Sequence, residues 1–90
     1  MICKQLHIHG LVQGVGYRWS LAREAQRLGV TGWVRNRRDG SVEAMVSGSD
    51  AEIGSLVAWA HRGPAAAHVV RVEVRDAQGE FETFEQWPTL

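Results

Sequence analysis

The chain has 90 residues, of which 44% are hydrophobic, and ten lysines and arginines balance ten aspartates and glutamates. This length suits one small domain with a single hydrophobic core, and this apolar content argues against a disordered chain. A formal net charge of zero argues against a general polyanion binder, so any recognition of anions must be local.

Residues 2–12 predict a strand with one buried face. Its apolar residues share one parity, which Lys4 interrupts: Ile2, Leu6, Ile8 and Val12. The polar residues of this segment break the apolar run that a signal peptide needs, and no stretch reaches the length of a membrane span. The one cysteine, Cys3, cannot form an intrachain disulfide, so we expect a soluble cytoplasmic protein.

A short loop, VQGVG at residues 12–16, leads into a first helix predicted over residues 19–28. We call this loop the glycine loop. Apolar residues recur at helical spacing through the helix, and Gly29 is placed to cap its end. Residues 30–48 then predict a β-hairpin, because valines alternate on both arms and Asp39-Gly40 supplies a turn.

The second half of the chain continues with a helix and one or two strands. Ser49 and Glu52 match a capping box, and apolar spacing predicts a helix that Gly63-Pro64 ends. Val70, Val72 and Val74 indicate a fourth strand, and residues 81–87 could add a fifth at the sheet edge.

The order strand-helix-strand-strand-helix-strand predicts a ferredoxin-like α+β fold in a single domain over residues 1–90. Two helices with apolar stripes would lie on one face of an antiparallel sheet.

The glycine loop is a candidate anion site. Gly14 and Gly16 would let successive backbone N–H groups turn inward as a nest, and the helix dipole adds positive potential. Arg18 lies at the helix start, where that dipole disfavours a cation; a role in gripping a phosphate would explain its position. On loop chemistry alone, a tight turn with a solvated arginine is the alternative. The glycine spacing fits neither a dinucleotide fingerprint nor a nucleotide P-loop.

A second segment, GWVRN, ends at Asn36, which shares parity with the core valines yet lies near the end of its strand. Its amide could face a cleft or could hydrogen-bond before the turn. Together VQGVGYR, the helix, GWVRN and DGSVEAMVSG closely resemble the acylphosphatase family over about residues 7–63, and GPAAAHVVRVEV extends the similarity into the fourth strand. The final GEFETFEQWPTL matches less distinctly.

The resemblance implies an enzyme that hydrolyses acyl phosphates to a carboxylate and inorganic phosphate. It implies that Arg18 binds the phosphoryl group together with the backbone amides of Val15, Gly16, Tyr17 and Arg18 itself, and that Asn36 positions the attacking water. Tyr17 stands where many members have phenylalanine.

This chemistry also suits the residues by themselves. A carboxylate leaving group, with a pKa of about 4, departs without a general acid. The protein must then orient water in line and hold the phosphoryl charge. An asparagine cannot act as a base at neutral pH, but it can accept a hydrogen bond from water. We therefore expect no covalent nucleophile, no cofactor and no metal.

Other candidate residues have ordinary structural alternatives. Cys3, His7 and His9 share a strand face, but no fourth ligand at suitable spacing is visible, so solvent-facing residues are preferred to a metal site. Three arginines surround Asn36 and indicate a solvated hairpin or a long-range attraction for anions: Arg35, Arg37 and Arg38. Two tryptophans flank the motifs and could border an acyl pocket or simply pack: Trp19 and Trp33.

Two other functions compete with the enzyme. An RNA recognition motif shares this topology, but its third strand carries aromatic residues, and SVEAMVSG has none. A non-catalytic anion-binding or regulatory module is the other alternative. The presence of both Arg18 and Asn36, and a chain that ends soon after the domain, favour a free enzyme. We expect its partners to be a small acyl phosphate and inorganic phosphate, with no nucleic acid or membrane, and we expect a monomer.

Overall fold

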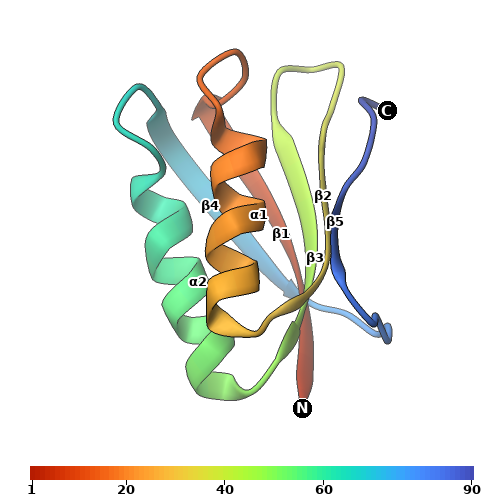
Figure 1. The fold of residues 1–90 in the computed structure, drawn as a ribbon. Helices are drawn as coiled ribbons and strands as arrows, with labels where there is room; N and C mark the ends of the chain where they lie inside the picture. The colour runs from red at the N-terminus through yellow and green to blue at the C-terminus, as the bar shows by residue number, and fades with distance from the viewer.

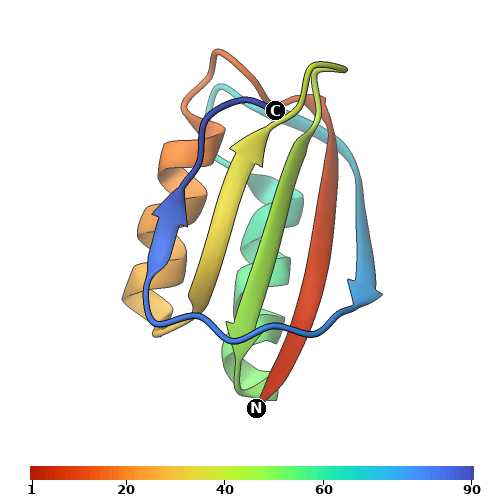
Figure 2. The same ribbon diagram turned by 90° about the vertical axis from the view of Figure 1, so that its right-hand side faces the viewer.

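The computed structural model describes residues 1–90. In chain order its elements are β1 (Ile2–Leu11), α1 (Tyr17–Leu28), β2 (Thr31–Asn36), β3 (Val42–Gly48), α2 (Asp50–Arg62), β4 (His68–Asp76) and β5 (Phe84–Gln86). Both helices lie on one face of a sheet with the strand order β4-β1-β3-β2-β5 (Figures 1 and 2). This is the predicted ferredoxin-like α+β fold.

The predicted edge strand is present as β5, and it gives the sheet a mixed character. Strands β1 to β4 pair antiparallel, whereas β5 runs parallel to β2, with Gly32 opposite Phe84 (Figure 2). The pairing continues past the strand, because Trp87 donates its backbone N–H to the carbonyl of Val34 at 2.8 Å. The chain end is thereby held along β2.

Strand β4 departs from the simple alternation predicted for it. Its register against β1 shifts between His9 and Gly10, which leaves Val70 as an extra residue in β4. Val70 is 69% exposed, while Val69 and Val72 pack against the core. The bulge therefore moves the apolar face of the strand by one residue.

The helices begin and end at recognisable signals. Helix α1 starts at Tyr17, two residues before the predicted start, because Gly16 is its N-cap in a left-handed conformation; it ends before Gly29, as predicted. In α2 the capping box is formed: Ser49 Oγ accepts from the backbone N–H of Glu52 at 3.1 Å, and the Glu52 carboxylate accepts from that of Ser49 at 2.9 Å. Such a cap contributes about 1 kcal/mol.

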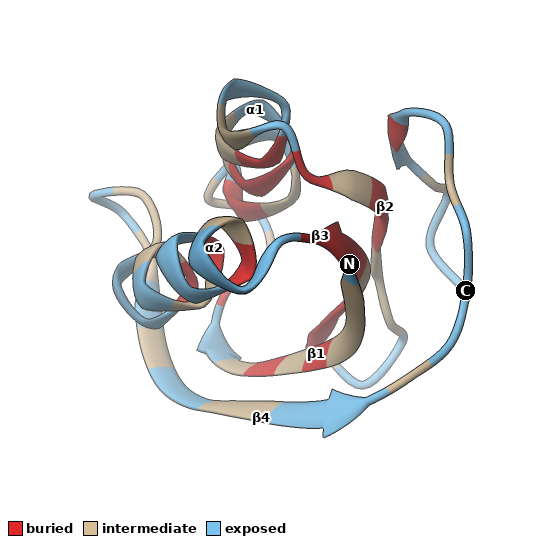
Figure 3. Cartoon of the chain, turned by 90° about the horizontal axis from the view of Figure 1, so that it is seen from below, coloured by how far each residue is buried: buried red, intermediate tan, exposed pale blue.

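The core fills the space between the helices and the sheet, where the buried surfaces of both layers face each other (Figure 3). Leu6 and Ile8 of β1 and Leu21 of α1 are fully buried there. Three segments meet at one end of this sandwich: the glycine loop, the β2–β3 turn and the chain end (Figure 1). Neither helix has the length and apolar character needed to cross a membrane.

Candidate active site

The glycine loop has the backbone conformation of an anion-binding nest. Gly14 and Gly16 have φ angles of +74° and +79°, which residues with a side chain rarely adopt. An added Cβ at either position would meet no atom within 4 Å, so backbone conformation alone requires glycine. Between them, Val15 packs its side chain against the core. The loop backbone is thereby anchored from below.

The amides of this loop have no acceptor in the protein. No backbone N–H of residues 14–19 donates to another group of the chain, and α1 has neither a capping side chain nor an acidic residue in its first turn. Unpaired donors at a helix N-terminus carry positive partial charge. The segment therefore presents a set of N–H groups suited to the oxygens of a phosphate.

Arg18 adds a full positive charge beside these amides. It is the second residue of α1, is partly buried, and lines a cavity of about 240 Å³ together with Gly14, Gly16 and Asn36. Its Nη1 donates to the carbonyl of Trp87 at 2.9 Å. This bond fixes the guanidinium and uses one of its five N–H groups, so the others are available to a ligand.

Asn36, the last residue of β2, lines the same cavity. Its Oδ1 is buried and has no hydrogen-bond partner in the protein. Burial of an acceptor without a partner costs about 1–3 kcal/mol, and most buried polar atoms avoid it. An orphaned acceptor that lines a cavity beside an arginine is therefore placed to receive a hydrogen bond from something bound there.

Gln13 connects the glycine loop to the turn that follows Asn36. Its Nε2 donates to the carbonyls of Arg37 at 2.6 Å and Ser41 at 2.8 Å. The two motifs that the sequence singled out are thus joined by a side chain that it did not. No local pattern marks Gln13, because both of its acceptors are backbone groups about 25 residues away.

Tyr17 contributes its amide to the loop and its side chain to the core. The side chain is 1% exposed, its hydroxyl donates to the carbonyl of Ala60 at 2.8 Å, and its ring lies 5.5 Å from that of Trp59. Burial raises the pKa of this phenol, so it stays neutral. Tyr17 therefore fixes the start of α1 against α2 and has no free hydroxyl in the cavity.

The tryptophans near the two motifs have different places. Trp19 is 55% exposed and lines the cavity, as a border residue would. Trp33 does not line it; its ring stacks on that of Trp87, with centroids 4.2 Å apart and planes at 9°. Of the two open alternatives for these residues, Trp19 fits a cavity border and Trp33 fits packing that holds the chain end.

The arginines around Asn36 are more engaged than a solvated hairpin would be. Arg35 and Arg37 both donate to the carboxylate of Glu43, at 3.0 and 3.2 Å, while Arg38 donates to the chain-end carbonyl. Burial raises the pKa of Glu43, but hydrogen bonds from Arg35 and Gln5 outweigh it and hold this pKa below its usual value. Two of the three charges are thus compensated, which leaves Arg18 as the cation of the cavity.

Known proteins match the whole of this arrangement. The family model described as Acylphosphatase matches residues 4–86. An acylphosphatase of Thiobacillus denitrificans is 58% identical over 81 residues, which cover 90% of this chain and 91% of the relative. One from an Acidovorax species is 54% identical over 90 residues, covering 99% and 93%. The crystal structure of the Bacillus subtilis acylphosphatase superposes with a TM-score of 0.92 at 29% identity, over 97% of this chain and 99% of that one.

Proposed function

This chain belongs to the acylphosphatase family and hydrolyses acyl phosphates to a carboxylate and inorganic phosphate, and we propose that the cavity shared by Arg18 and Asn36 is where it does so. The observation that carries this proposal is the meeting, in one cavity, of unpaired amides, a guanidinium and an orphaned amide oxygen. The competing RNA-binding and regulatory functions are not favoured by these relatives.

In this proposal the phosphoryl group lies in the nest of the glycine loop. The amides of Val15, Gly16, Tyr17 and Arg18 donate to its oxygens, and the Arg18 guanidinium neutralises part of its charge. Support comes from the left-handed glycines and the unpaired N–H groups. Because these donors are fixed before substrate arrives, they stabilise the charge that redistributes in the transition state.

Asn36 orients the nucleophile. Its Oδ1 accepts a hydrogen bond from a water molecule, which aims an oxygen lone pair at phosphorus opposite the leaving carboxylate. Attack forms the new P–O bond, the P–O bond to the acyl group breaks, and the water proton passes to the phosphate product. The orphaned Oδ1 supports this role, because it lacks any other partner.

The cavity has no group that could serve as a general acid. None of its lining residues is Asp, Glu, His, Cys or Lys, and the hydroxyl of Tyr17 is committed to Ala60. A carboxylate leaves without protonation, whereas the alkoxide of an ordinary phosphate monoester does not. The site is therefore specific for mixed anhydrides of phosphate by its chemistry.

The test of this proposal compares two substrates with the purified protein. Hydrolysis of benzoyl phosphate should be rapid, and hydrolysis of an alkyl phosphate such as glycerol phosphate should be undetectable. Comparable turnover of both substrates would contradict a site without a general acid.

We also propose that residues 1–90 act as a single catalytic domain, as a monomer in the cytoplasm and without nucleic acid. One buried cluster spans both helices and the sheet, which supports a single domain. A sedimentation experiment at enzyme concentrations used for assay should give the mass of one chain, 10.0 kDa; a dimer mass would contradict the monomer.

A further inference from the structure

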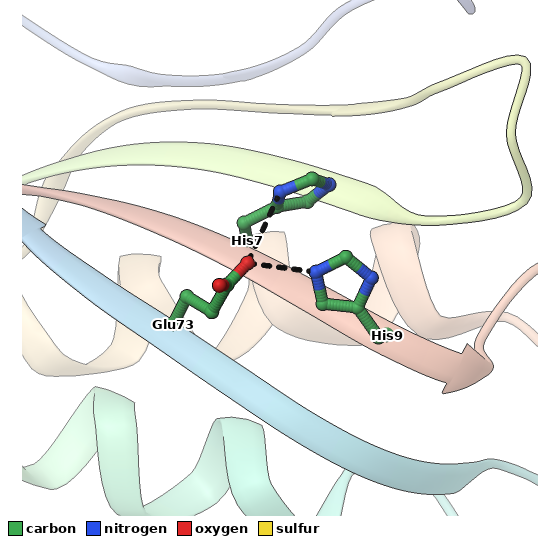
Figure 4. A group of neighbouring side chains, drawn as sticks. All are labelled: His7, His9 and Glu73. Carbon is green, nitrogen blue, oxygen red and sulfur yellow. Dashed lines mark hydrogen bonds and ion pairs between the residues drawn. The ribbon is translucent and has the colours of Figure 1, made fainter.

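Three side chains with metal-ligating atoms converge on the open face of the sheet, opposite the helices (Figure 4). His7 and His9 come from β1, and Glu73 comes from the neighbouring strand β4. One atom of each lies within 4.8 Å of the other two. None of the three lines the catalytic cavity, so the cluster is separate from the proposed active site.

The strand pairing explains why these residues meet. His7 and His9 are two residues apart on β1 and so project from the same face. Glu73 lies directly opposite His7 in the antiparallel pair of β1 with β4. The same carboxylate oxygen, Oε1, is 2.9 Å from His9 Nε2 and 3.6 Å from His7 Nδ1. The sequence gave no sign of this ligand, because Glu73 is 64 residues from His9.

These separations match the edges of a tetrahedral coordination shell. Zinc binds imidazole nitrogen and carboxylate oxygen at about 2.0–2.1 Å, so two ligand atoms of a tetrahedron lie about 3.3 Å apart. The carboxylate already lies near that distance from both histidines. Small rotations of the partly exposed rings would bring their nitrogens into the same shell.

A chain of hydrogen bonds sets the tautomer of His7. Ser41 Oγ lies 2.5 Å from Asp39 Oδ1, and because an ionised carboxylate only accepts, this hydroxyl donates to Asp39. His7 Nε2 lies 2.7 Å from the same Oγ and must therefore donate its proton to it. In the neutral ring, Nδ1 is then the nitrogen with a lone pair, and it faces Glu73. This is the outer hydrogen bond that metal-binding histidines commonly make.

We propose that His7, His9 and Glu73 bind one divalent transition-metal ion, zinc in the first instance, on the open face of the sheet. A lone pair of His7 Nδ1 faces a carboxylate oxygen across 3.6 Å, an arrangement that a cation between them stabilises. The fourth position of the tetrahedron faces solvent and takes a water molecule.

Nearby arginines limit the affinity. Arg71 Nε lies 3.9 Å from the second oxygen of Glu73, and Arg37 and Arg75 line the shallow groove next to the cluster. Their positive charges oppose a dication, although water screens exposed charges at this distance. We therefore expect a micromolar site rather than the far tighter binding of a closed structural zinc site.

The experiment is a titration of the purified, chelator-treated protein with Zn²⁺ by isothermal calorimetry, repeated with Co²⁺ and read by absorption. The expected result is one ion per chain with a dissociation constant in the micromolar range, and the visible bands of tetrahedral Co²⁺. His9→Ala and Glu73→Gln should each weaken binding by more than about tenfold, and Ser41→Ala, which frees the tautomer of His7, by about tenfold.

The matched control is His61→Ala, which removes an exposed histidine at the end of α2 and should bind zinc like the original protein. Circular dichroism establishes that each variant is folded, and His9→Gln replaces His9→Ala if the alanine variant is not. Binding that survives in both His9 variants, or that is lost in His61→Ala, would overturn the proposal. Absence of a stoichiometric site in the original protein would do so as well.

Discussion

Replacement of Asn36 by alanine should separate activity from stability. The side-chain oxygen is buried without a partner in the protein, so its presence penalises the folded state when the cavity is empty of ligand. Alanine keeps the Cβ and removes both the orphaned acceptor and the proposed hydrogen bond to water. Turnover should therefore fall while the folded protein becomes no less stable.

The sizes of the two effects follow from the same atom. An unsatisfied buried acceptor costs about 1–3 kcal/mol, part of which water in the open cavity recovers, so we expect the free energy of unfolding to rise by up to about 1 kcal/mol. In urea this corresponds to a midpoint shift of about 0.5 M for a small protein. Loss of the positioning interaction should cost about 3 kcal/mol in the transition state, more than a hundredfold in kcat.

The assay combines steady-state hydrolysis of benzoyl phosphate, inhibition by inorganic phosphate and urea unfolding. Phosphate affinity should stay near that of the original protein, because bound phosphate does not need the water. Thr31→Ala, at the other end of β2, is the matched control and should keep full turnover. Turnover of Asn36→Ala within twofold of the original protein would refute the role given to this amide.

Three further expectations concern the same cavity. Inorganic phosphate added to the ¹⁵N-labelled protein should shift the amides of residues 14–18 most; shifts confined to another region would misplace the nest. Gln13→Ala removes two hydrogen bonds between the glycine loop and the β2–β3 turn, so kcat should fall about fivefold or more, and an unchanged kcat would show that this tie is not needed. Dialysis against a chelator should leave benzoyl phosphate turnover intact, because no cavity residue is a carboxylate, histidine or cysteine; activity lost and then restored by magnesium would contradict the mechanism.

Local patterns in the sequence were enough to predict the order of elements. Apolar periodicity marked both helices and four strands, and the Ser49–Glu52 capping box formed as predicted. The parallel direction of β5 was not predicted, because it depends on pairing with β2, about 50 residues earlier in the chain. The exposed position of Val70 depends likewise on a bulge that only the β1–β4 pairing reveals.

The site follows the same division. Gly14, Gly16 and Arg18 form a contiguous motif, and their local chemistry indicated an anion site before any fold was known. The partners that hold this motif in place could not be predicted, since they are backbone carbonyls: Trp87 for Arg18, and Arg37 and Ser41 for Gln13. A carbonyl belongs to every residue and leaves no signal in the sequence.

The central claim is that the cavity at Arg18 is the catalytic site, and the kinetics of Arg18→Ala on benzoyl phosphate test it most directly. Loss of the guanidinium should abolish measurable turnover and remove competitive inhibition by phosphate, and Arg18→Lys should not restore it, because an ammonium cannot reproduce the planar fork. Arg27→Ala, an exposed arginine in the last turn of the same helix, should behave like the original protein. Turnover by Arg18→Ala comparable to that of Arg27→Ala, with phosphate inhibition intact, would contradict the claim.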